Sequence, residues 1–293
     1  MEKLRLKAPG KINLGLDIIG KRADGYHDIK TLMHTISLYD ELTFAKAEKT
    51  SLICDDPDIP GDTNNIVIKC VLALESHVKR ELPVAITLKK NIPTRAGLGG
   101  GSADGACTLR ALNFLYDLNV GLEELCEAGK GVGADIPFMV RGGFALCEGI
   151  GERITPIENT FSYPLLLVKP NFSVDTKAAY DFSDNAHNQP NCDFERILAS
   201  LEKPGVCEAR NDFEEYLAAF HPKALEIKAE LYESGAFLAG LSGSGSCFYG
   251  IFEQTETAQR AAEVLSGKYP FVCTQRLCDS QGALIDHKGL IIK

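Results

Sequence analysis

The sequence of 293 residues has no long apolar run that could cross a membrane. No stretch reaches the roughly 18 uninterrupted apolar residues that a membrane-spanning helix needs. The opening stretch, MEKLRLKAPGKINLGLDI, is interrupted by charges and by Pro9 and Gly10, so it lacks the apolar core of a signal peptide. We therefore expect a cytoplasmic protein without a membrane partner.

Basic charge is also scarce. The chain has 31 lysines and arginines against 40 aspartates and glutamates, a formal net charge of −9, and no basic run is longer than two or three residues. This balance argues against nonspecific binding of nucleic acid. An anionic substrate would have to be bound locally, by backbone N–H groups, a helix N-terminus and a few placed cations.

Cysteine motifs are missing although the chain has ten cysteines. No CxxC occurs, and no group of cysteines and histidines has the spacing of zinc ligands. Most cysteines lie in apolar runs, such as Cys70 in IVIKCVLAL. We expect reduced, buried thiols in a reducing cytosol.

Length and apolar periodicity indicate an α+β protein with two domains that join near residue 160. The patterns predict two strands around a Pro-Gly turn in residues 3–20 and two more strands in residues 27–47. Further strands are expected within residues 84–93, 163–174, 236–252 and, as the last strand, 271–278. Helices are expected within residues 64–78, 102–116, 122–131, 211–235 and 255–267. The polar residues 183–193 are expected to be the most flexible segment.

The most informative segment places four glycines in positions 97–101, between an expected strand and an expected helix. Glycine permits positive φ and lets a backbone approach a ligand closely. The helix that follows presents free N–H groups and the positive end of its dipole, which together favour phosphate. Ser102 adds a hydroxyl, either as helix N-cap or as a ligand to a phosphate oxygen or metal ion. The alternative is a tight connection without a ligand, but such turns usually need only one or two glycines.

The missing residues argue against the two large classes of phosphate loop. No Gly-Lys pair is followed by Ser or Thr, so the Walker A pattern is absent. The glycines do not fit G-x-G-x-x-G either, because the sixth residue is Ser102 or Asp104 when the count starts at Gly97 or Gly99. Neither HRD nor DFG occurs, which argues against a protein kinase.

Four other stretches each allow two interpretations. Lys11 is either a lysine at a strand edge facing solvent or a buried cation with a partner. Asp135 is either a helix cap, which the local sequence favours, or a carboxylate that acts as general base at the floor of a cavity. Tyr26 and His27 form either an exposed hairpin turn, which the local sequence favours, or a rim that binds a planar ring. The Gly/Ser turn in residues 241–250 is either flexible or faces a ligand.

Three stretches together resemble the motifs of the GHMP superfamily, which contains galactokinase, homoserine kinase, mevalonate kinase and phosphomevalonate kinase. They are APGKINLGL, PTRAGLGGGSADGA and LSGSGSCFYG, and they occur in the order of the family. Two more stretches, GKRADGYHDI and GADIPF, resemble one branch, the 4-diphosphocytidyl-2-C-methyl-D-erythritol kinases. The resemblance implies an N-terminal ATP-binding domain, residues 1–160, a C-terminal domain, residues 161–293, and an active site in the cleft between them.

The resemblance also implies the reaction and its residues. The reaction is the ATP-dependent phosphorylation of a hydroxyl of a cytidine diphosphate conjugate of methylerythritol, in the non-mevalonate isoprenoid precursor pathway, with ATP and Mg²⁺ as cofactors. Lys11 and Asp135 are the implied catalytic pair. The residues implied to bind ATP are Asn65, Ile66, Pro93, Gly97, Leu98, Gly99, Gly100, Gly101 and Ser102. Those implied to bind the acceptor are Asn13, Tyr26, His27, Thr176 and Tyr180.

These roles agree with the chemistry of the side chains. Asp135 could accept or orient the proton of the attacking hydroxyl, and Lys11 would keep that carboxylate ionised. Stacking by Tyr26 and hydrogen bonds from His27 would select cytosine. One departure is Ala103, where the family pattern leads us to expect a second serine.

Two alternative functions stay open on the sequence. One is a mevalonate-type or homoserine kinase of the same superfamily, in which Tyr26 and His27 would have no role. The other is a nucleotide sensor without catalysis, against which the presence of Lys11 and Asp135 argues.

Overall fold

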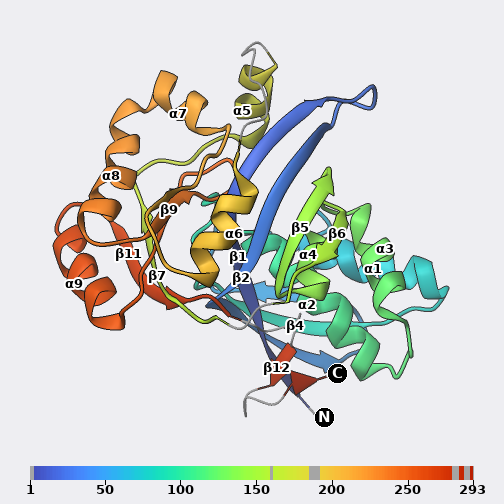
Figure 1. The fold of residues 1–293 in the computed structure, drawn as a ribbon. Helices are drawn as coiled ribbons and strands as arrows, with labels where there is room; N and C mark the ends of the chain where they lie inside the picture. Colours follow the sequence, from blue (N-terminus) through green and yellow to red (C-terminus); the bar gives the residue numbers. More distant parts are fainter. Residues whose placement is uncertain (1–2, 159–160, 185–191, 279–283, 287–290, 293) are drawn as a thin grey trace.

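The computed structural model describes residues 3–158, 161–184, 192–278, 284–286 and 291–292. These residues form two sheets with helices packed against them (Figure 1). Most of the segment that was predicted to be flexible lies outside the described residues. The α+β class is confirmed, and the expected division near residue 160 falls in the connection between two strands of different sheets.

The first sheet has eight strands in the described part of the chain. Six of them follow the order β13-β12-β1-β2-β4-β3, while β5 pairs with β2 and β6 pairs with β5. The strands are β1 (Leu4–Lys21), β2 (His27–Lys46), β3 (Ser51–Cys54), β4 (Val84–Lys89), β5 (Phe144–Gly149), β6 (Arg153–Pro156), β12 (Leu284–Asp286) and β13 (Ile291–Ile292).

The antiparallel hairpin of β1 and β2 replaces the four short strands that the sequence predicted, so that prediction is wrong. The Pro-Gly pair makes no turn, because a shift of register between Pro9 and Lys11 lets β1 continue past it. The second edge of β2 pairs with β5 along residues 29–34 and with β4 along residues 41–46. Each half of β2 therefore has its own partner although its backbone is continuous.

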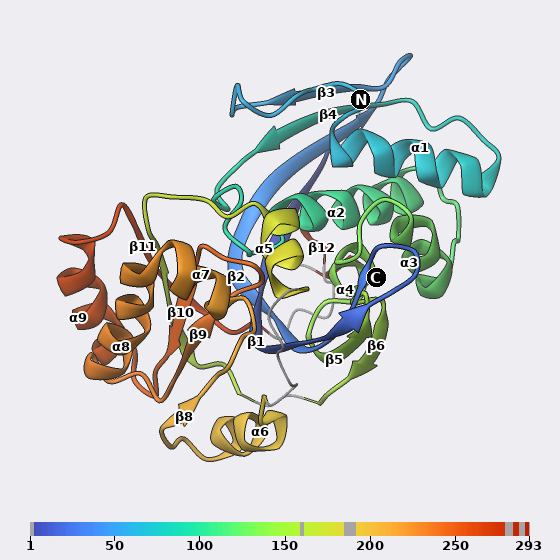
Figure 2. The same cartoon turned by 90° about the horizontal axis from the view of Figure 1, so that it is seen from above.

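Four helices pack beside the first sheet, on one side of the long hairpin (Figure 2). They are α1 (Ile66–Val78), α2 (Gly100–Leu115), α3 (Leu122–Lys130) and α4 (Ile136–Arg141). Helix α1 buries Val67, Val71 and Leu74 at helical spacing, and the side chain of Asn65 caps it by accepting a hydrogen bond from the N–H of Val67 at 2.8 Å. The predicted α1 is confirmed, with Asn65 as its cap.

The second sheet has the strand order β11-β7-β10-β9-β8 and carries the other helices. Its strands are β7 (Pro164–Lys169), β8 (Cys207–Glu208), β9 (Leu238–Leu241), β10 (Phe248–Ile251) and β11 (Phe271–Arg276). The helices of this half are α5 (Thr176–Ser183), α6 (Phe194–Glu202), α7 (Glu214–Phe220), the 3₁₀ helix η1 (Pro222–Leu225), α8 (Glu226–Glu233) and α9 (Thr255–Ser266).

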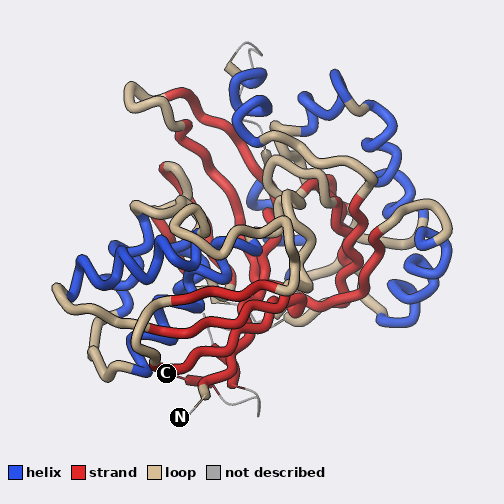
Figure 3. Tube along the Cα trace, turned by 180° about the vertical axis from the view of Figure 1, so that it is seen from behind, coloured by secondary structure: helices blue, strands red, loops and turns tan. Residues whose placement is uncertain are grey.

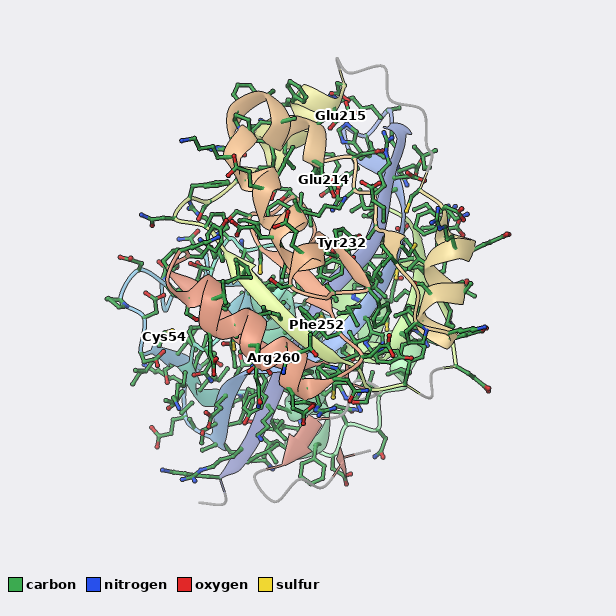
Figure 4. The ribbon with its side chains drawn as sticks, turned by 60° about the vertical axis from the view of Figure 1, so that its left-hand side comes forward. Cys54, Glu214, Glu215, Tyr232, Phe252 and Arg260 are labelled. Atoms are coloured by element: carbon green, nitrogen blue, oxygen red, sulfur yellow. The ribbon has the colours of Figure 1, made fainter. Side chains whose placement is uncertain are left out.

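The single helix predicted for residues 211–235 is wrong, because the chain breaks between α7 and α8. Pro222 disfavours the helical conformation of the residue before it, and His221 has φ −139° and ψ 52°. Figure 4 turns this half forward and labels Glu214 on α7 and Tyr232 on α8. The carboxylate of Glu214 accepts a hydrogen bond from Lys228 at 3.0 Å, which ties the two helices together.

The two sheets meet at the hairpin, with helices to either side (Figure 3). One hydrophobic core joins Ile12 and Ile36 of the hairpin to Leu167 and Tyr249 of the second sheet. The sequence predicted β11 as the last strand, and this prediction is wrong. Strand β12 follows it and pairs with β1, with Asp286 opposite Leu6.

Two further expectations concern the whole chain. Seven cysteines are buried as free thiols, as predicted: Cys70, Cys107, Cys126, Cys147, Cys192, Cys207 and Cys247. Among the described residues, none of the helices is long and apolar enough to cross a membrane.

Candidate active site

Two cavities lie next to each other where the hairpin, the start of α2 and the turn between β9 and β10 meet. The larger has a volume of about 630 Å³ and the smaller about 430 Å³. They share a wall, which we define by the residues that line both cavities: Arg95, Gly97, Gly99 and Ser102.

All the site residues that the sequence suggested line one cavity or both. The larger cavity is lined by Lys11, Asn13, Tyr26, His27, Asp135, Thr176 and Tyr180. The smaller cavity is lined by Asn65, Ile66, Pro93, Leu98, Gly100 and Gly101. Gly97, Gly99 and Ser102 belong to the shared wall. The fold therefore brings together residues that are up to 169 positions apart, from Lys11 to Tyr180.

Lys11 is a buried cation with partners, which decides between its two interpretations. Its residue is 3% exposed, and its ammonium group donates a hydrogen bond to Oδ1 of Asn13 at 2.6 Å. The same nitrogen lies 3.5 Å from Oδ2 of Asp135. Lys11 and Asn13 point to the same side because alternate residues of a strand share a face. Shifts of register on either side of this pair, before Lys11 and after Asn13, adjust the direction of both side chains.

Asn13 is fixed by contacts from two other parts of the chain, strand β2 and the turn between β9 and β10. Its Nδ2 donates to Oγ1 of Thr31 at 2.9 Å, and its Oδ1 accepts from the N–H of Gly243 at 2.9 Å. Its own N–H donates to Oγ of Ser242 at 3.3 Å. Asn13 therefore links the hairpin to the turn between β9 and β10.

At positions 97 and 99, the backbone conformation and the close neighbours leave room only for glycine. Gly97 has φ +76°, and a Cβ there would lie 1.9 Å from the carbonyl oxygen of Ser242. Gly99 has φ +67°, and its Cβ would lie 2.5 Å from Cε of Met139. The loop passes this close to its neighbours because the N–H of Lys11 donates to the carbonyl of Leu98 at 2.9 Å. Two of the four glycines are thus explained by packing and by positive φ.

The remaining glycines open α2, which begins two residues before the predicted start. Gly99 is its N-cap and offers no side-chain cap, so the prediction of Ser102 as N-cap is wrong. The first helical hydrogen bond runs from the N–H of Ala103 to the carbonyl of Gly99 at 2.8 Å. The N–H groups of Gly100, Gly101 and Ser102 precede this bond, at the positive end of the helix. The first turn of α2 can therefore bind an anion.

Asp135 stands at the N-cap position of α4, yet its carboxylate makes no capping hydrogen bond. Its side chain is 30% exposed, lines the larger cavity and faces Lys11. The local sequence favoured a cap, and that interpretation is wrong. The carboxylate is instead directed into the cavity, beside a buried ammonium group.

The far end of the larger cavity is formed by the ends of the hairpin strands and by α5 (Figure 1). His27 is 8% exposed and stacks on Tyr180, with ring centroids 4.5 Å apart and 14° between the planes. Nε2 of His27 lies 2.6 Å from Oδ1 of Asp184, whose Oδ2 accepts from Lys21 at 2.5 Å. The hydrogen bonds from Lys21 and His27 lower the pKa of Asp184 below its usual range. Tyr26, by contrast, is 58% exposed.

The turn between β9 and β10 also faces the larger cavity. Gly243, Ser244 and Gly245 line it, so the interpretation of this turn as facing a ligand site is the one the geometry favours. Oγ of Ser244 lies 2.8 Å from Oγ1 of Thr176 at the start of α5. The hydroxyl of Ser242 donates to the carbonyl of Gly97 at 2.9 Å, which fixes the turn against the glycine loop.

The smaller cavity has a buried charged cluster in its wall. Lys90 donates to Oδ2 of Asp104 at 2.7 Å and to the carboxylate of Asp40. Burial, and then the neighbouring Asp40, raise the pKa of Asp104 well above its usual range. Oδ1 of Asp104 has no hydrogen-bond partner among the described residues. The ammonium group of Lys90 is thus the shared hydrogen-bond donor of two buried acidic side chains beside the smaller cavity.

Sequence reasoning missed several residues of the site. Thr31, Asp184 and Lys90 belong to no motif that the sequence analysis used, and Arg95 lies in the stretch PTRAGLGGGSADGA but was given no role there. Only Arg95 carried a signal, because it stands two positions before the glycine loop.

Comparison with known proteins places the chain in a family. The model of the GHMP kinase N-terminal domain matches residues 65–143, and that of the C-terminal domain matches residues 193–270. A 4-diphosphocytidyl-2-C-methyl-D-erythritol kinase of Prosthecochloris aestuarii is 40% identical over 281 residues, which cover 92% of this chain and 96% of the relative. The chain belongs to the 4-diphosphocytidyl-2-C-methyl-D-erythritol kinase family.

Solved structures agree with this family. A crystal structure of a 4-(cytidine 5'-diphospho)-2C-methyl-D-erythritol kinase superposes with a TM-score of 0.80 at 30% identity, covering 93% of this chain and 98% of that one. A homoserine kinase from Cytophaga hutchinsonii superposes with a TM-score of 0.70 at 17% identity, covering 96% of each chain. The second likeness shows the shared fold of GHMP kinases, and the first lies within the 4-diphosphocytidyl-2-C-methyl-D-erythritol kinase family.

Proposed function

We propose that this chain transfers the γ-phosphoryl group of ATP to a hydroxyl of 4-diphosphocytidyl-2-C-methyl-D-erythritol, a step of the non-mevalonate isoprenoid precursor pathway. The observation that carries the proposal is the position of the pair Lys11 and Asp135, 3.5 Å apart, beside the wall between two cavities. A kinase for a small molecule needs this arrangement, because donor and acceptor must meet at one point from separate sites.

ATP occupies the smaller cavity in this proposal. Asn65, Ile66 and Pro93 line it, and Asn65 and Ile66 would contact the adenine. The polyphosphate would then run toward residues 97–102, where the N–H groups at the start of α2 and the helix dipole favour negative charge. The acidic net charge of the chain is no obstacle, since this positive field is local.

The acceptor occupies the larger cavity. Its hydroxyl oxygen attacks the γ-phosphorus, the bond between that phosphorus and the bridging oxygen breaks, and ADP leaves with the electron pair. The hydroxyl proton passes to the carboxylate of Asp135. Lys11 lies 3.5 Å from this carboxylate and stabilises the negative charge on the group in transfer.

Mg²⁺ is proposed as the metal that accompanies ATP. No group of three metal-ligating side chains occurs among the described residues, so these residues offer no closed cage. This fits Mg²⁺, which usually keeps several waters and binds through substrate phosphates and one or two protein oxygens. Ser102 lines both cavities and would supply one such oxygen. The ion would neutralise phosphate charge during transfer.

The cytidine end would lie near the hairpin tip. Tyr26 is 58% exposed at the cavity rim and has a face available for stacking. His27 offers polar groups beside it, while Thr176 and Tyr180 close the pocket from α5. A pocket that pairs polar edges of a base rejects rings that lack them.

A turnover assay with several acceptors tests this function. The protein is incubated with ATP, Mg²⁺ and, separately, the cytidine diphosphate conjugate, mevalonate or homoserine, and release of ADP is measured. We expect turnover with the conjugate alone. Turnover of mevalonate or homoserine in its place would overturn the proposed acceptor, and binding of ATP without any turnover would favour a sensor.

A further inference from the structure

The shared wall contains one charged side chain, Arg95, to which the proposed reaction gives no role so far. Among the described residues it is the one cation that lines both cavities. It stands between Pro93 and Gly97, where the backbone has left its strand and has not yet entered α2. A positive charge at this point lies next to both cavities, and so next to both ATP and the alcohol of the proposed reaction.

The two buried lysines nearest to the wall already have carboxylate partners. Lys11 lies beside Asp135 and donates to Asn13, and Lys90 is held between two buried carboxylates. The side chain of Arg95 is exposed and makes no hydrogen bond or ion pair with any described residue. The phosphates of ATP carry several negative charges, so a cation without an internal partner at this wall has a chemical use.

The backbone of Arg95 supports the same conclusion. Arg95 has φ +51°, a left-handed conformation that is uncommon for residues other than glycine. The next residue, Ala96, is 2% exposed, and its carbonyl accepts a hydrogen bond from the N–H of Cys247 at 3.1 Å. The fold thus holds Arg95 in an unfavourable conformation at the wall rather than placing a glycine there.

We propose that the guanidinium group of Arg95 binds the phosphates of ATP at the shared wall and stabilises the phosphoryl group during transfer to the acceptor. A guanidinium presents parallel N–H donors that match two phosphate oxygens and stays charged at any working pH. Charge that spreads over the transferred group is then met by Lys11 on one side and Arg95 on the other. The role in transfer rests on the proposed function, whereas the binding of ATP does not depend on the acceptor.

Three variants test the proposal. Arg95→Gln removes the charge and keeps most of the length of the side chain, and Arg95→Lys keeps the charge without the planar donors. The matched control is Lys79→Gln, because Lys79 is an exposed cation with φ +52° at the end of α1, outside both cavities. All three keep a residue other than glycine in a left-handed conformation, so their melting temperatures should stay close together.

The deciding measurement is the affinity for ATP with Mg²⁺, by titration calorimetry without acceptor. We expect Arg95→Gln to weaken binding about tenfold or more, as the loss of a charge-assisted hydrogen bond predicts. Arg95→Lys should recover part of that loss, and Lys79→Gln should bind like the unchanged protein. At saturating ATP, kcat of Arg95→Gln for the conjugate should also fall at least tenfold.

An affinity of Arg95→Gln within threefold of that of Lys79→Gln would overturn the proposal, as would an unchanged kcat. The failure of the proposed function gives a different result. If the unchanged protein binds ATP but does not turn over the conjugate, the acceptor assignment is wrong, and the ATP affinity of Arg95→Gln still decides whether Arg95 binds phosphate.

Discussion

At the scale of single residues, the proposed role of Asp135 as general base rests on the position of its carboxylate beside Lys11. We expect Asp135→Asn to lower kcat at least about 100-fold, because the amide has the same shape but cannot take up a proton. The affinity for ATP should be unchanged, since Asp135 does not line the smaller cavity. Steady-state kinetics and calorimetry measure the two effects.

The control for this prediction is Glu263→Gln, which removes an exposed carboxylate from α9. It should leave kcat as it is. If Asp135→Asn were as active as this control, Asp135 would not be the general base and the mechanism would have to be revised.

Asp184 contacts His27, which lines the larger cavity. We expect Asp184→Ala to raise the KM for the acceptor about five- to tenfold with little change in kcat, because the ring of His27 loses the partner 2.6 Å from its Nε2. Lys21→Gln should have a smaller effect, since it leaves the contact between Asp184 and His27 in place. An equal fall in kcat would place Asp184 in the chemical step instead.

The contact between Asp184 and His27 also shows what a sequence cannot give at this scale. Motifs located Lys11, Asp135 and the glycine loop, because each has a local pattern. Asp184 lies 157 positions after His27, so only the fold brings the two together. Tyr180 is placed at the cavity as the family resemblance implied, but one face of its ring is covered by His27.

At the scale of elements, the glycine loop contains glycines of two kinds, and two substitutions separate them. Gly97→Ala should lower the free energy of unfolding by at least about 2 kcal/mol, because it combines φ +76° with a contact of 1.9 Å to backbone. Gly101→Ala should raise it by about 0.5–1 kcal/mol, because alanine favours the helix and its Cβ would lie 3.5 Å from the nearest atom.

For Gly101→Ala, the affinity for ATP should fall although the free energy of unfolding rises. Gly101 lines the smaller cavity, so we expect Gly101→Ala to weaken ATP binding about tenfold although the fold is more stable. Gly131→Ala is the control, because a Cβ there meets no atom within 4 Å and the residue ends α3, away from both cavities. Denaturant unfolding and calorimetry on the same samples give both quantities. Unaltered ATP binding by Gly101→Ala would mean that the phosphates lie elsewhere.

Elements were predictable where one local signal decides them. Helices α1 and α9, and the strands β9 and β10 around their turn, follow from apolar spacing and turn residues. The prediction of elements failed where the pairing of strands outweighs local turn signals. The sequence pattern predicted two strands in place of β2. No local signal shows that its two halves form one continuous strand with a different partner for each half.

At the scale of the whole molecule, stability should depend on pH through His34. Burial lowers the pKa of His34 from 6.5 to about 4. Between these values the unfolded chain binds the proton and the folded protein does not, so the free energy of unfolding falls as pH falls from about 6.5 to about 4. The full loss from this residue is on the order of 3 kcal/mol.

The measurement is the difference in pH dependence between the unchanged protein and His34→Asn. The variant keeps a donor near Nδ1, which lies 2.7 Å from the carbonyl of Thr35, but it cannot titrate. Taking the difference is necessary because Asp104, whose pKa is raised, changes stability in the opposite direction. Parallel curves for the two proteins would contradict the assignment to His34.

The arrangement of the halves was only partly visible in the sequence. Three motifs in family order implied two halves around one cleft, and the residues they carry do line adjoining cavities. The return of the chain to the first sheet was missed, because β12 and β13 span only three and two residues and their short apolar runs carry no clear strand pattern.

The shared wall has a consequence for how such enzymes diversify. Arg95, Gly97, Gly99 and Ser102 line both cavities, so in the proposed function a change there would affect the binding of both ligands. Tyr26 and its neighbours at the opposite end line the larger cavity alone, so in the proposed function they would contact the acceptor only. Substitutions at the far end of the larger cavity can therefore change which alcohol is recognised without affecting the binding of ATP. Related enzymes can in this way acquire new acceptors while the glycine loop stays the same.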